Sequence, residues 1–336
     1  MLLSPSIGVG RAGAFIGRGH VATQTIHPDM QPLLDAREQA DALVGPQGET
    51  PEDARRWWRV YASILPQPRP ADMHVFDATI PAGHGGVPVR VYQPAGRSGA
   101  RPCVLYMHGG GFMLGDLDTS DGNAWGYAQE TGATVVSIDY RLTPEHPYPA
   151  AFDDCYGVLT WLAANPDEVG IDAGRIAVVG DSAGGMLGAA LALASRDRGG
   201  PPIAAQALLY GWFGLEQDAG SYVEFADGPG LTSASMHRFD RLYLPDDPDS
   251  ADPYARPVRA LDFTNLPPAL VHAAGIDPIR DDSRFFAARL ALAGTPVTYR
   301  EARGMIHGFL RARSAGPGAH AEFTVACAFL REHLNS

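Results

Sequence analysis

The stretch that most constrains the fold of this chain is a glycine-bounded pentapeptide, Gly180-Asp181-Ser182-Ala183-Gly184. An apolar run over residues 176–179 precedes it, and an Ala- and Leu-rich segment that predicts a helix over 183–196 follows it. A G-x-S-x-G motif between a strand and a helix is typical of a nucleophile elbow, a strained turn that exposes the serine hydroxyl. Residues beside the serine must be small, because bulk would clash with the strand and the helix. The motif therefore predicts a nucleophilic Ser182 at a helix N-terminus, where the dipole favours developing negative charge.

Short apolar runs flanked by turn residues recur from about residue 74 onward. The expected strands are 74–80, 87–92, 103–107, 134–138, 176–179, 207–210, 269–273 and 296–302. Helical patterns alternate with the later runs, over 149–164, 183–196, 280–293 and 319–334. Continuous apolar strands suit a parallel sheet that is covered on both faces. The alternation predicts a doubly wound α/β sheet that is mostly parallel and carries helices on both faces. Together with the G-x-S-x-G elbow, it leads us to expect an α/β-hydrolase fold with a helical cap.

Two segments outside this alternation supply the expected cap. Residues 28–65 predict two helices, the second of which begins near Pro51. Residues 213–262 are loop-rich and acidic and contain one helical patch near 233–243. Ligands of open α/β sheets bind at the carboxyl ends of the strands, which these segments are expected to cover. The predicted organisation is a flexible tail over 1–25, an N-terminal cap segment over 26–70, and a catalytic domain over 71–336 with a cap insertion at about 213–262.

A second motif, His108-Gly109-Gly110-Gly111-Phe112, directly follows the strand at 103–107. Glycines let the backbone approach a substrate closely and turn its N–H groups toward an oxyanion. The amides of Gly110 and Gly111, joined by that of Ala183, are the predicted oxyanion hole. His108 and Gly109 are expected to support the motif, since a triad histidine on this architecture lies after the nucleophile.

The chain order of this architecture, serine, then acid, then histidine, selects the other two catalytic candidates. Asp277 follows the strand at 269–273 and precedes a helix, and His307 follows the strand at 296–302. His307 would accept the Ser182 proton, while Asp277 would orient the imidazole. Asp277 could also be a simple helix cap. Asp181 and Asp281 are assigned supporting positions, and Asp281 and Asp282 also suit the first turn of a helix.

Composition excludes several classes of function. A formal net charge of −12 argues against a nucleic-acid partner and against docking on an anionic membrane. The sequence contains no apolar run of about 18 residues or more, so no stable membrane insertion is expected. Its three widely spaced cysteines, Cys103, Cys155 and Cys327, form neither a disulfide framework nor a metal motif, and they fit a cytoplasmic location. No metal site is predicted.

With these motifs in place, the sequence resembles the bacterial hormone-sensitive-lipase family (family IV) of α/β-hydrolase esterases. The stretches 115–118 and 139–150 are also similar to that family, and the resemblance covers roughly residues 70–334. It implies hydrolysis of short- or medium-acyl carboxylic esters through an acyl-enzyme, with no cofactor and a small-molecule ester as the binding partner. It also implies a buried polar brace formed by Tyr140, Arg141 and Glu145. A homodimer is compatible with the family.

Two positions depart from the family pattern. Met186 stands where asparagine is common, and Gly211-Trp212-Phe213 follows a strand after which proline is common. Met186, Trp212 and Phe213, together with Phe112, are the candidates for the substrate pocket. Two alternative functions stay open at this point. One is a receptor-like ligand-binding protein on the same fold, and the other is a hydrolase of amides, carbamates or lactones, or a deacetylase.

Overall fold

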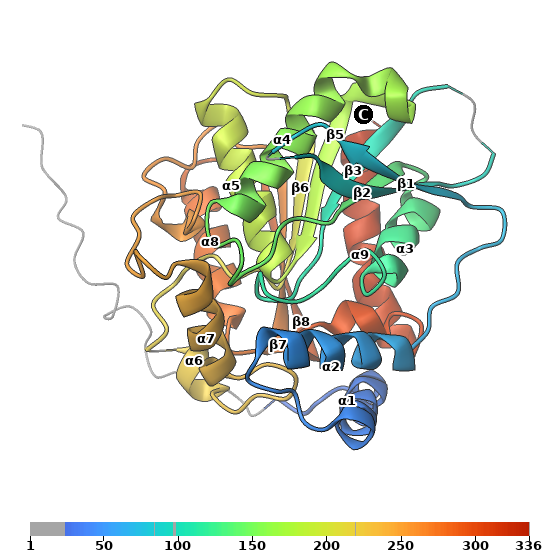
Figure 1. The fold of residues 1–336 in the computed structure, drawn as a ribbon. Coiled ribbons are helices and arrows are strands. Elements are labelled where there is room, and N and C mark those ends of the chain that lie inside the picture. Colours follow the sequence, from blue (N-terminus) through green and yellow to red (C-terminus); the bar gives the residue numbers. More distant parts are fainter. Residues whose placement is uncertain (1–23, 84, 97–98, 219, 336) are drawn as a thin grey trace, which may run out of the picture.

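The computed structural model describes residues 24–83, 85–96, 99–218 and 220–335 (Figure 1). The tail predicted over residues 1–25 therefore falls almost wholly outside the described residues. One sheet organises the described part, with strands in the order β1-β2-β4-β3-β5-β6-β7-β8. The first two strands pair antiparallel with each other, β2 pairs antiparallel with β4, and all the later pairs are parallel.

Every predicted strand is present, but β5 begins five residues earlier and β8 ends four residues later than predicted. The strands are β1 (His74–Ile80), β2 (Val87–Gln93), β3 (Arg101–Met107), β4 (Thr134–Ile138), β5 (Ile171–Asp181), β6 (Ala205–Leu209), β7 (Ala269–Ile276) and β8 (Val297–Ile306). The strands β3, β4, β6 and β7 are entirely buried, β5 is buried over residues 176–180, and β8 is an edge strand with exposed residues. This burial explains why the central strands are continuously apolar in sequence.

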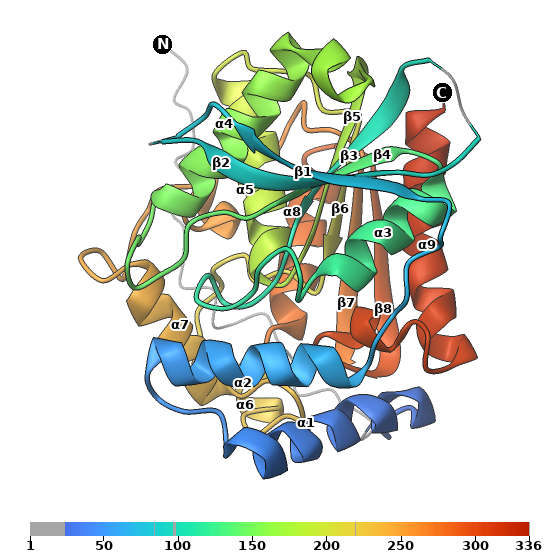
Figure 2. The ribbon, with the colours of Figure 1, turned by 45° about the vertical axis from the view of Figure 1, so that its right-hand side comes forward.

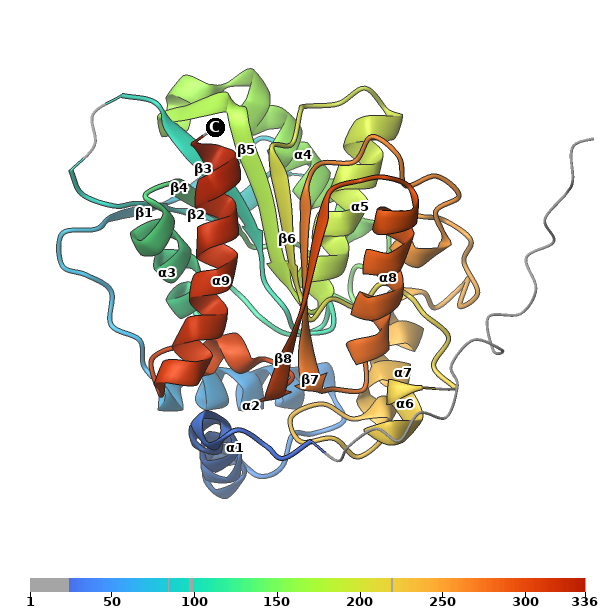
Figure 3. The ribbon, with the colours of Figure 1, turned by 180° about the vertical axis from the view of Figure 1, so that it is seen from behind.

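Helices cover both faces of the sheet, as predicted (Figure 3). One face carries α3 (Asp121–Thr131) and α9 (Pro317–Leu334), and the other carries α4 (Ala150–Ala164), α5 (Ala183–Asp197) and α8 (Arg280–Leu292). The sequence prediction missed α3. Its residues include two glycines and several polar groups, so it lacks a clear apolar period, and it forms because Ala124, Tyr127 and Ala128 are buried against the sheet and α9.

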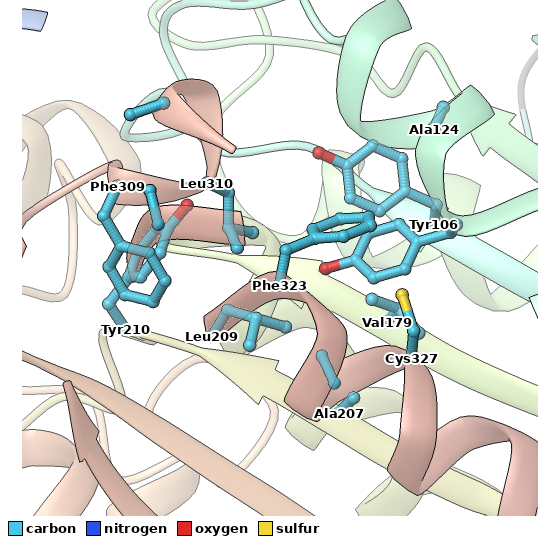
Figure 4. Packing of buried hydrophobic residues seen from close by; sticks show 14 of the residues in the cluster. Tyr106, Ala124, Val179, Ala207, Leu209, Tyr210, Phe309, Leu310, Phe323 and Cys327 are labelled. Carbon is cyan, nitrogen blue, oxygen red and sulfur yellow. The ribbon is translucent and has the colours of Figure 1, made fainter. Parts of the chain in front are cut away.

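The core beneath α9 is built from aromatic and small residues (Figure 4). Phe323 and Cys327 of α9 face side chains of the central strands, including Tyr106 and Val179. The rings of Tyr127 and Phe323 lie 4.7 Å apart, centroid to centroid, so α3 and α9 are joined by an aromatic contact. This packing holds β3 and β5 rigid, and the loops that follow these two strands carry the site described below.

Four helices lie at the carboxyl ends of the parallel strands. Figure 2 shows α1 (Gln31–Val44) and α2 (Pro51–Ile64) below the sheet, and Figure 1 shows α6 (Ser221–Glu224) and α7 (Ser233–Tyr243) beside them. The helices predicted within 28–65 and the helical patch predicted at 233–243 are confirmed as elements. The division of the chain into tail, cap and catalytic domain stays a prediction.

Ion-paired arginines, Arg55 among them, tie α2 to the body of the protein. Arg55 donates to both carboxylate oxygens of Glu145 at 2.7 Å and to the carbonyl oxygens of Met113 and Thr143 at 2.9 Å. Met113 follows the glycine-rich loop, so α2 and this loop are mechanically connected. Among the described helices, none is long and apolar enough to cross a bilayer.

Candidate active site

Ser182 sits in a strained turn between β5 and α5. Its backbone has φ 57° and ψ −119°, a conformation that costs a non-glycine residue roughly 1–3 kcal/mol. The surrounding contacts hold it there, because its amide donates to Leu209 O at 2.9 Å and its carbonyl accepts from Met186 N at 3.2 Å. A side chain on Gly184 would collide with the carbonyl oxygen of Met107, so only glycine lets α5 approach β3 this closely. The turn is thus the predicted strand–turn–helix elbow.

The structure brings the three predicted catalytic candidates together. His307 Nε2 lies 2.9 Å from Ser182 Oγ, and His307 Nδ1 lies 2.7 Å from Asp277 Oδ2. In the tautomer that carries its proton on Nδ1, His307 donates to Asp277 and accepts from the serine hydroxyl. This is the arrangement that a serine nucleophile, its general base and an orienting carboxylate require.

The orienting carboxylate is completely buried. Asp277 has no exposed surface, and its second oxygen accepts from Ile279 N at 3.0 Å. This bond closes a turn just before α8, whose N-cap residue is Ile279 and has no side-chain cap, so Asp277 is not the helix cap; its other oxygen faces His307. The imidazole also packs edge-on against the ring of Tyr210, with 5.0 Å between the two ring centroids. Both contacts limit the rotation of His307.

The glycine-rich loop folds back beside the serine. Gly110 and Gly111 have φ values of +132° and +60°, and the carbonyl of Gly110 accepts from Leu114 N at 2.9 Å. Gly110, Gly111 and Ala183 all line the same cavity as Ser182. None of their amides donates a hydrogen bond to another group in the described part of the chain. Three N–H groups are therefore free to meet an oxyanion.

The supporting residues of the two motifs have defined contacts. His108 Nδ1 lies 2.9 Å from Gly109 O, and its ring stacks on Tyr140 at 4.3 Å. Burial lowers the pKa of His108, so this side chain packs under the loop in its neutral form. Asp181 accepts from the Tyr106 hydroxyl at 2.6 Å and so is fixed beside the nucleophile.

The acids at the start of α8 anchor the elements that cover the site. Asp281 Oδ2 accepts from Ser221 N at 3.0 Å, which ties α8 to α6. Asp282 is fully buried and accepts from Phe213 N at 2.9 Å, Leu215 N at 3.1 Å and the Tyr222 hydroxyl at 2.9 Å. Burial raises the pKa of Asp282 to about 7 against these three donors. From sequence both acids suit a helix dipole, but the structure also gives them this long-range anchoring role.

The cavity above Ser182 corrects the predicted pocket. Trp212 lines it, whereas Phe112, Met186 and Phe213 do not and are completely buried. Phe112 instead stacks on Tyr243 at 3.9 Å, and Phe213 stacks on Phe286 at 4.3 Å. Apolar residues that neighbour a motif in sequence need not face the ligand, because neighbours point in different directions from a turn.

Much of the cavity wall comes from the two predicted cap segments, in which the sequence singled out none of the lining residues as site residues. The cap side contributes Arg37, Gln47, Trp58, Tyr61, Leu231, Thr232, Ser235, Met236 and Phe239, and the body contributes Tyr210 and Arg311. The one available signal was the amphipathic character of α2 and α7, whose buried faces need a partner.

The polar brace implied by the family resemblance is wrong in its partners. Arg141 pairs with Asp154 at 2.7 Å, and Glu145, whose side chain is 52% exposed, pairs with Arg55. Tyr140 donates to His108 O at 2.6 Å. The two charges therefore brace different neighbours instead of each other.

The three cysteines lie in the core. Cys103, Cys155 and Cys327 are buried, and burial raises the pKa of each thiol, that of Cys103 to about 12. Within the part of the chain that the structure describes, no group of three or more His, Cys, Asp or Glu side chains is arranged to hold a metal ion.

Comparisons with known proteins agree with this geometry. A family model described as "alpha/beta hydrolase fold" matches residues 104–311. The chain is 42% identical to the esterase LipI of Mycobacterium tuberculosis, over 75% of this chain and 80% of LipI. It is 37% identical to the carboxylic ester hydrolase LipN of the same organism, over 93% of this chain and 84% of LipN. The chain belongs to the hormone-sensitive-lipase family of α/β-hydrolase esterases.

Solved structures support the same family. A thermostable esterase from Pseudomonas putida superposes with a TM-score of 0.85 at 32% identity, covering 93% of this chain and 99% of that esterase. The α/β-hydrolase enzyme LAE6, from the metagenome of Lake Arreo, gives a TM-score of 0.86 at 34% identity, over 93% and 99% of the two chains. The expected fold class and enzyme class, a serine carboxylesterase, are therefore confirmed.

Proposed function

We propose that this chain hydrolyses short- and medium-acyl carboxylic esters through an acyl-enzyme on Ser182, with His307 and Asp277 completing a catalytic triad. The observation that carries the proposal is the unbroken relay from Ser182 Oγ through His307 to the buried Asp277, at 2.9 and 2.7 Å. Ser182 and His307 line the same cavity as Gly110, Gly111 and Ala183, whose amides are free. A binding protein without catalysis does not need this arrangement.

The geometry gives each group one task in the first half-reaction. Ser182 Oγ attacks the ester carbonyl carbon while His307 Nε2 takes its proton. The negative charge on the carbonyl oxygen is stabilised by the amides of Gly110, Gly111 and Ala183. When the tetrahedral intermediate collapses, the C–O bond to the alcohol breaks, and His307 returns the proton to the departing alkoxide.

The second half-reaction uses the same groups with water as the nucleophile. His307 removes a proton from water as the water attacks the acyl carbon, and then returns the proton to Ser182 Oγ when the acid leaves. Asp277 stays ionised and stabilises the imidazolium in both halves. Apolar walls at Leu231, Met236 and Phe239 suit a hydrocarbon acyl chain of limited length.

The test is hydrolysis of p-nitrophenyl esters from acetate to decanoate, together with labelling by a serine-directed fluorophosphonate. The wild type should turn over the shorter esters and be labelled, and Ser182→Ala should lose both properties. The control is Ser63→Ala, which removes a hydroxyl on the exposed side of α2 and should change nothing. Absence of turnover in the wild type, or full activity in Ser182→Ala, would contradict the proposal.

A further inference from the structure

The active-site cavity is lined by two guanidinium groups without carboxylate partners. Arg37 of α1 and Arg311, which follows β8, both line the cavity and are partly buried. No carboxylate in the described part of the chain lies within ion-pairing distance of either. The sequence before residue 24 contains no aspartate or glutamate that could neutralise them. This is unusual in a chain with a net charge of −12.

Aromatic rings hold both cations in place. The Arg37 guanidinium carbon lies 4.9 Å from the Trp57 ring centroid and 5.7 Å from that of Tyr61. The corresponding atom of Arg311 lies 4.6 Å from the Trp58 ring and 5.8 Å from the same Tyr61 ring. Stacking orients an arginine and leaves its N–H edge available for an anion. Arg311 Nη1 donates a hydrogen bond to Thr119 O at 2.9 Å.

Two further donors lie near these guanidinium groups. The Tyr61 hydroxyl makes no hydrogen bond to any described residue although its ring is buried, and it also lines the cavity. Burial raises the pKa of Tyr61 while the nearby charges of Arg311 and Arg37 oppose the rise, so the phenol stays protonated and can donate. The indole N–H of Trp58 is buried without a partner in the described structure. Unpaired buried donors are costly, and an acceptor on a ligand would offset that cost.

Two carboxylates lie beside the reacting groups of the site. Asp181 lines the wall next to Ser182, and Asp277 is buried behind His307. An anionic substituent is disfavoured beside these carboxylates and favoured beside the guanidiniums. A substrate with a reactive ester and a distant anion would therefore be oriented along the cavity by charge.

We infer that the natural substrates are esters that carry a carboxylate remote from the scissile bond, and that Arg37 and Arg311, with the Tyr61 hydroxyl, bind that carboxylate. This inference rests on the proposed esterase function and narrows its substrate class. Arg37 and Arg311 are specificity-determining residues that do not touch the reacting atoms. Planar guanidinium groups match the geometry of a carboxylate better than ammonium groups do.

Two pairs of isosteric substrates test the inference. In the first pair, p-nitrophenyl hydrogen adipate carries the anion on the acyl side, and p-nitrophenyl 6-methylheptanoate is its neutral counterpart. In the second pair, the butyrate ester of 4-hydroxybenzoate carries the anion on the alcohol side, and the butyrate ester of 4-hydroxybenzamide is neutral. For each pair, the ratio of kcat/KM for the anionic ester to that for the neutral ester is measured in the wild type, Arg37→Gln and Arg311→Gln.

The wild type should prefer the anionic ester in at least one pair, and each variant should reduce that preference about tenfold, since a hydrogen bond to a charged group is typically worth that factor or more. Raising the salt concentration should also weaken the preference. The matched control is Arg56→Gln, which removes the same charge from an exposed site on α2 and should leave the ratio unchanged. Calorimetry measures the affinity of Ser182→Ala, which cannot hydrolyse the ester, for the anionic ester. That affinity should be lower in Ser182→Ala/Arg37→Gln and in Ser182→Ala/Arg311→Gln.

The outcomes separate this inference from the proposed function. Equal use of anionic and neutral esters in both pairs, or a preference that survives in Arg37→Gln and Arg311→Gln, overturns the inference and leaves the esterase function standing. Absence of turnover for all four esters, with no fluorophosphonate labelling of Ser182, overturns the proposed function and the inference with it.

Discussion

Replacement of Gly111 by alanine should disable the oxyanion hole through a contact with the cap. Gly111 has φ +60°, and a Cβ atom built there would overlap the ring of Phe239, with Cδ1 at 2.6 Å. An L-residue in this left-handed region costs roughly 1–2 kcal/mol. Phe239 belongs to α7, so the overlap pushes the glycine-rich loop and the cap apart.

The magnitude follows from what the loop supplies. Displacement of the loop removes the Gly111 amide, and loss of one oxyanion donor typically costs about 2.7–4 kcal/mol of transition-state stabilisation. We therefore expect kcat for p-nitrophenyl butyrate to fall about 100- to 1,000-fold in Gly111→Ala, with a smaller change in KM. This loss of transition-state stabilisation should exceed the free-energy cost of the left-handed backbone at residue 111.

A double-mutant cycle separates the overlap from the backbone strain. Phe239→Ala removes the ring, so Gly111→Ala/Phe239→Ala should recover at least about tenfold in kcat over Gly111→Ala, while the left-handed strain remains. Circular dichroism and thermal unfolding check that each variant is folded. If Gly111→Ala keeps kcat within about threefold of the wild type, or if the two substitutions are additive, the proposed coupling between cap and oxyanion loop is wrong.

Three further predictions concern the triad, a buried acid and metals. Asp277→Asn should retain the fold but lose about 10,000-fold in kcat, because an amide favours the wrong histidine tautomer; a loss below tenfold by steady-state kinetics would contradict the assigned role. Burial raises the pKa of Asp282 to about 7, above its value of about 3.9 in the unfolded chain. Between these pH values the native state keeps a proton that the unfolded state loses, so the free energy of unfolding falls as pH rises. In urea unfolding, Asp282→Asn should therefore gain about 2–3 kcal/mol relative to the wild type between pH 5 and pH 8, and a pH-independent difference would show that Asp282 is already ionised at pH 5. Dialysis against EDTA should leave kcat unchanged, and recovery of lost activity by added metal would count against the serine mechanism.

The sequence determined this protein's fold class and predicted its reacting residues, because both depend on local chemistry. The elbow around Ser182 needs small residues where α5 approaches β3, and the glycines and alanine of the motif are those residues. The continuously apolar strands report that the sheet is buried on both faces, and most helix bounds follow from caps and apolar spacing. The helix α3 was missed because its stability comes from packing against α9, and its own sequence has no clear period.

The tertiary structure alone decided which groups meet across long stretches of chain. It brought Arg37 and Tyr61 of the N-terminal helices to the same cavity as Arg311, and it gave Arg141 and Glu145 different partners from those expected. It also buried Asp282 under backbone amides that lie 67 and 69 positions away. Such pairings depend on how helices and loops pack over the sheet, and no residue pattern within one segment records where a distant segment will lie.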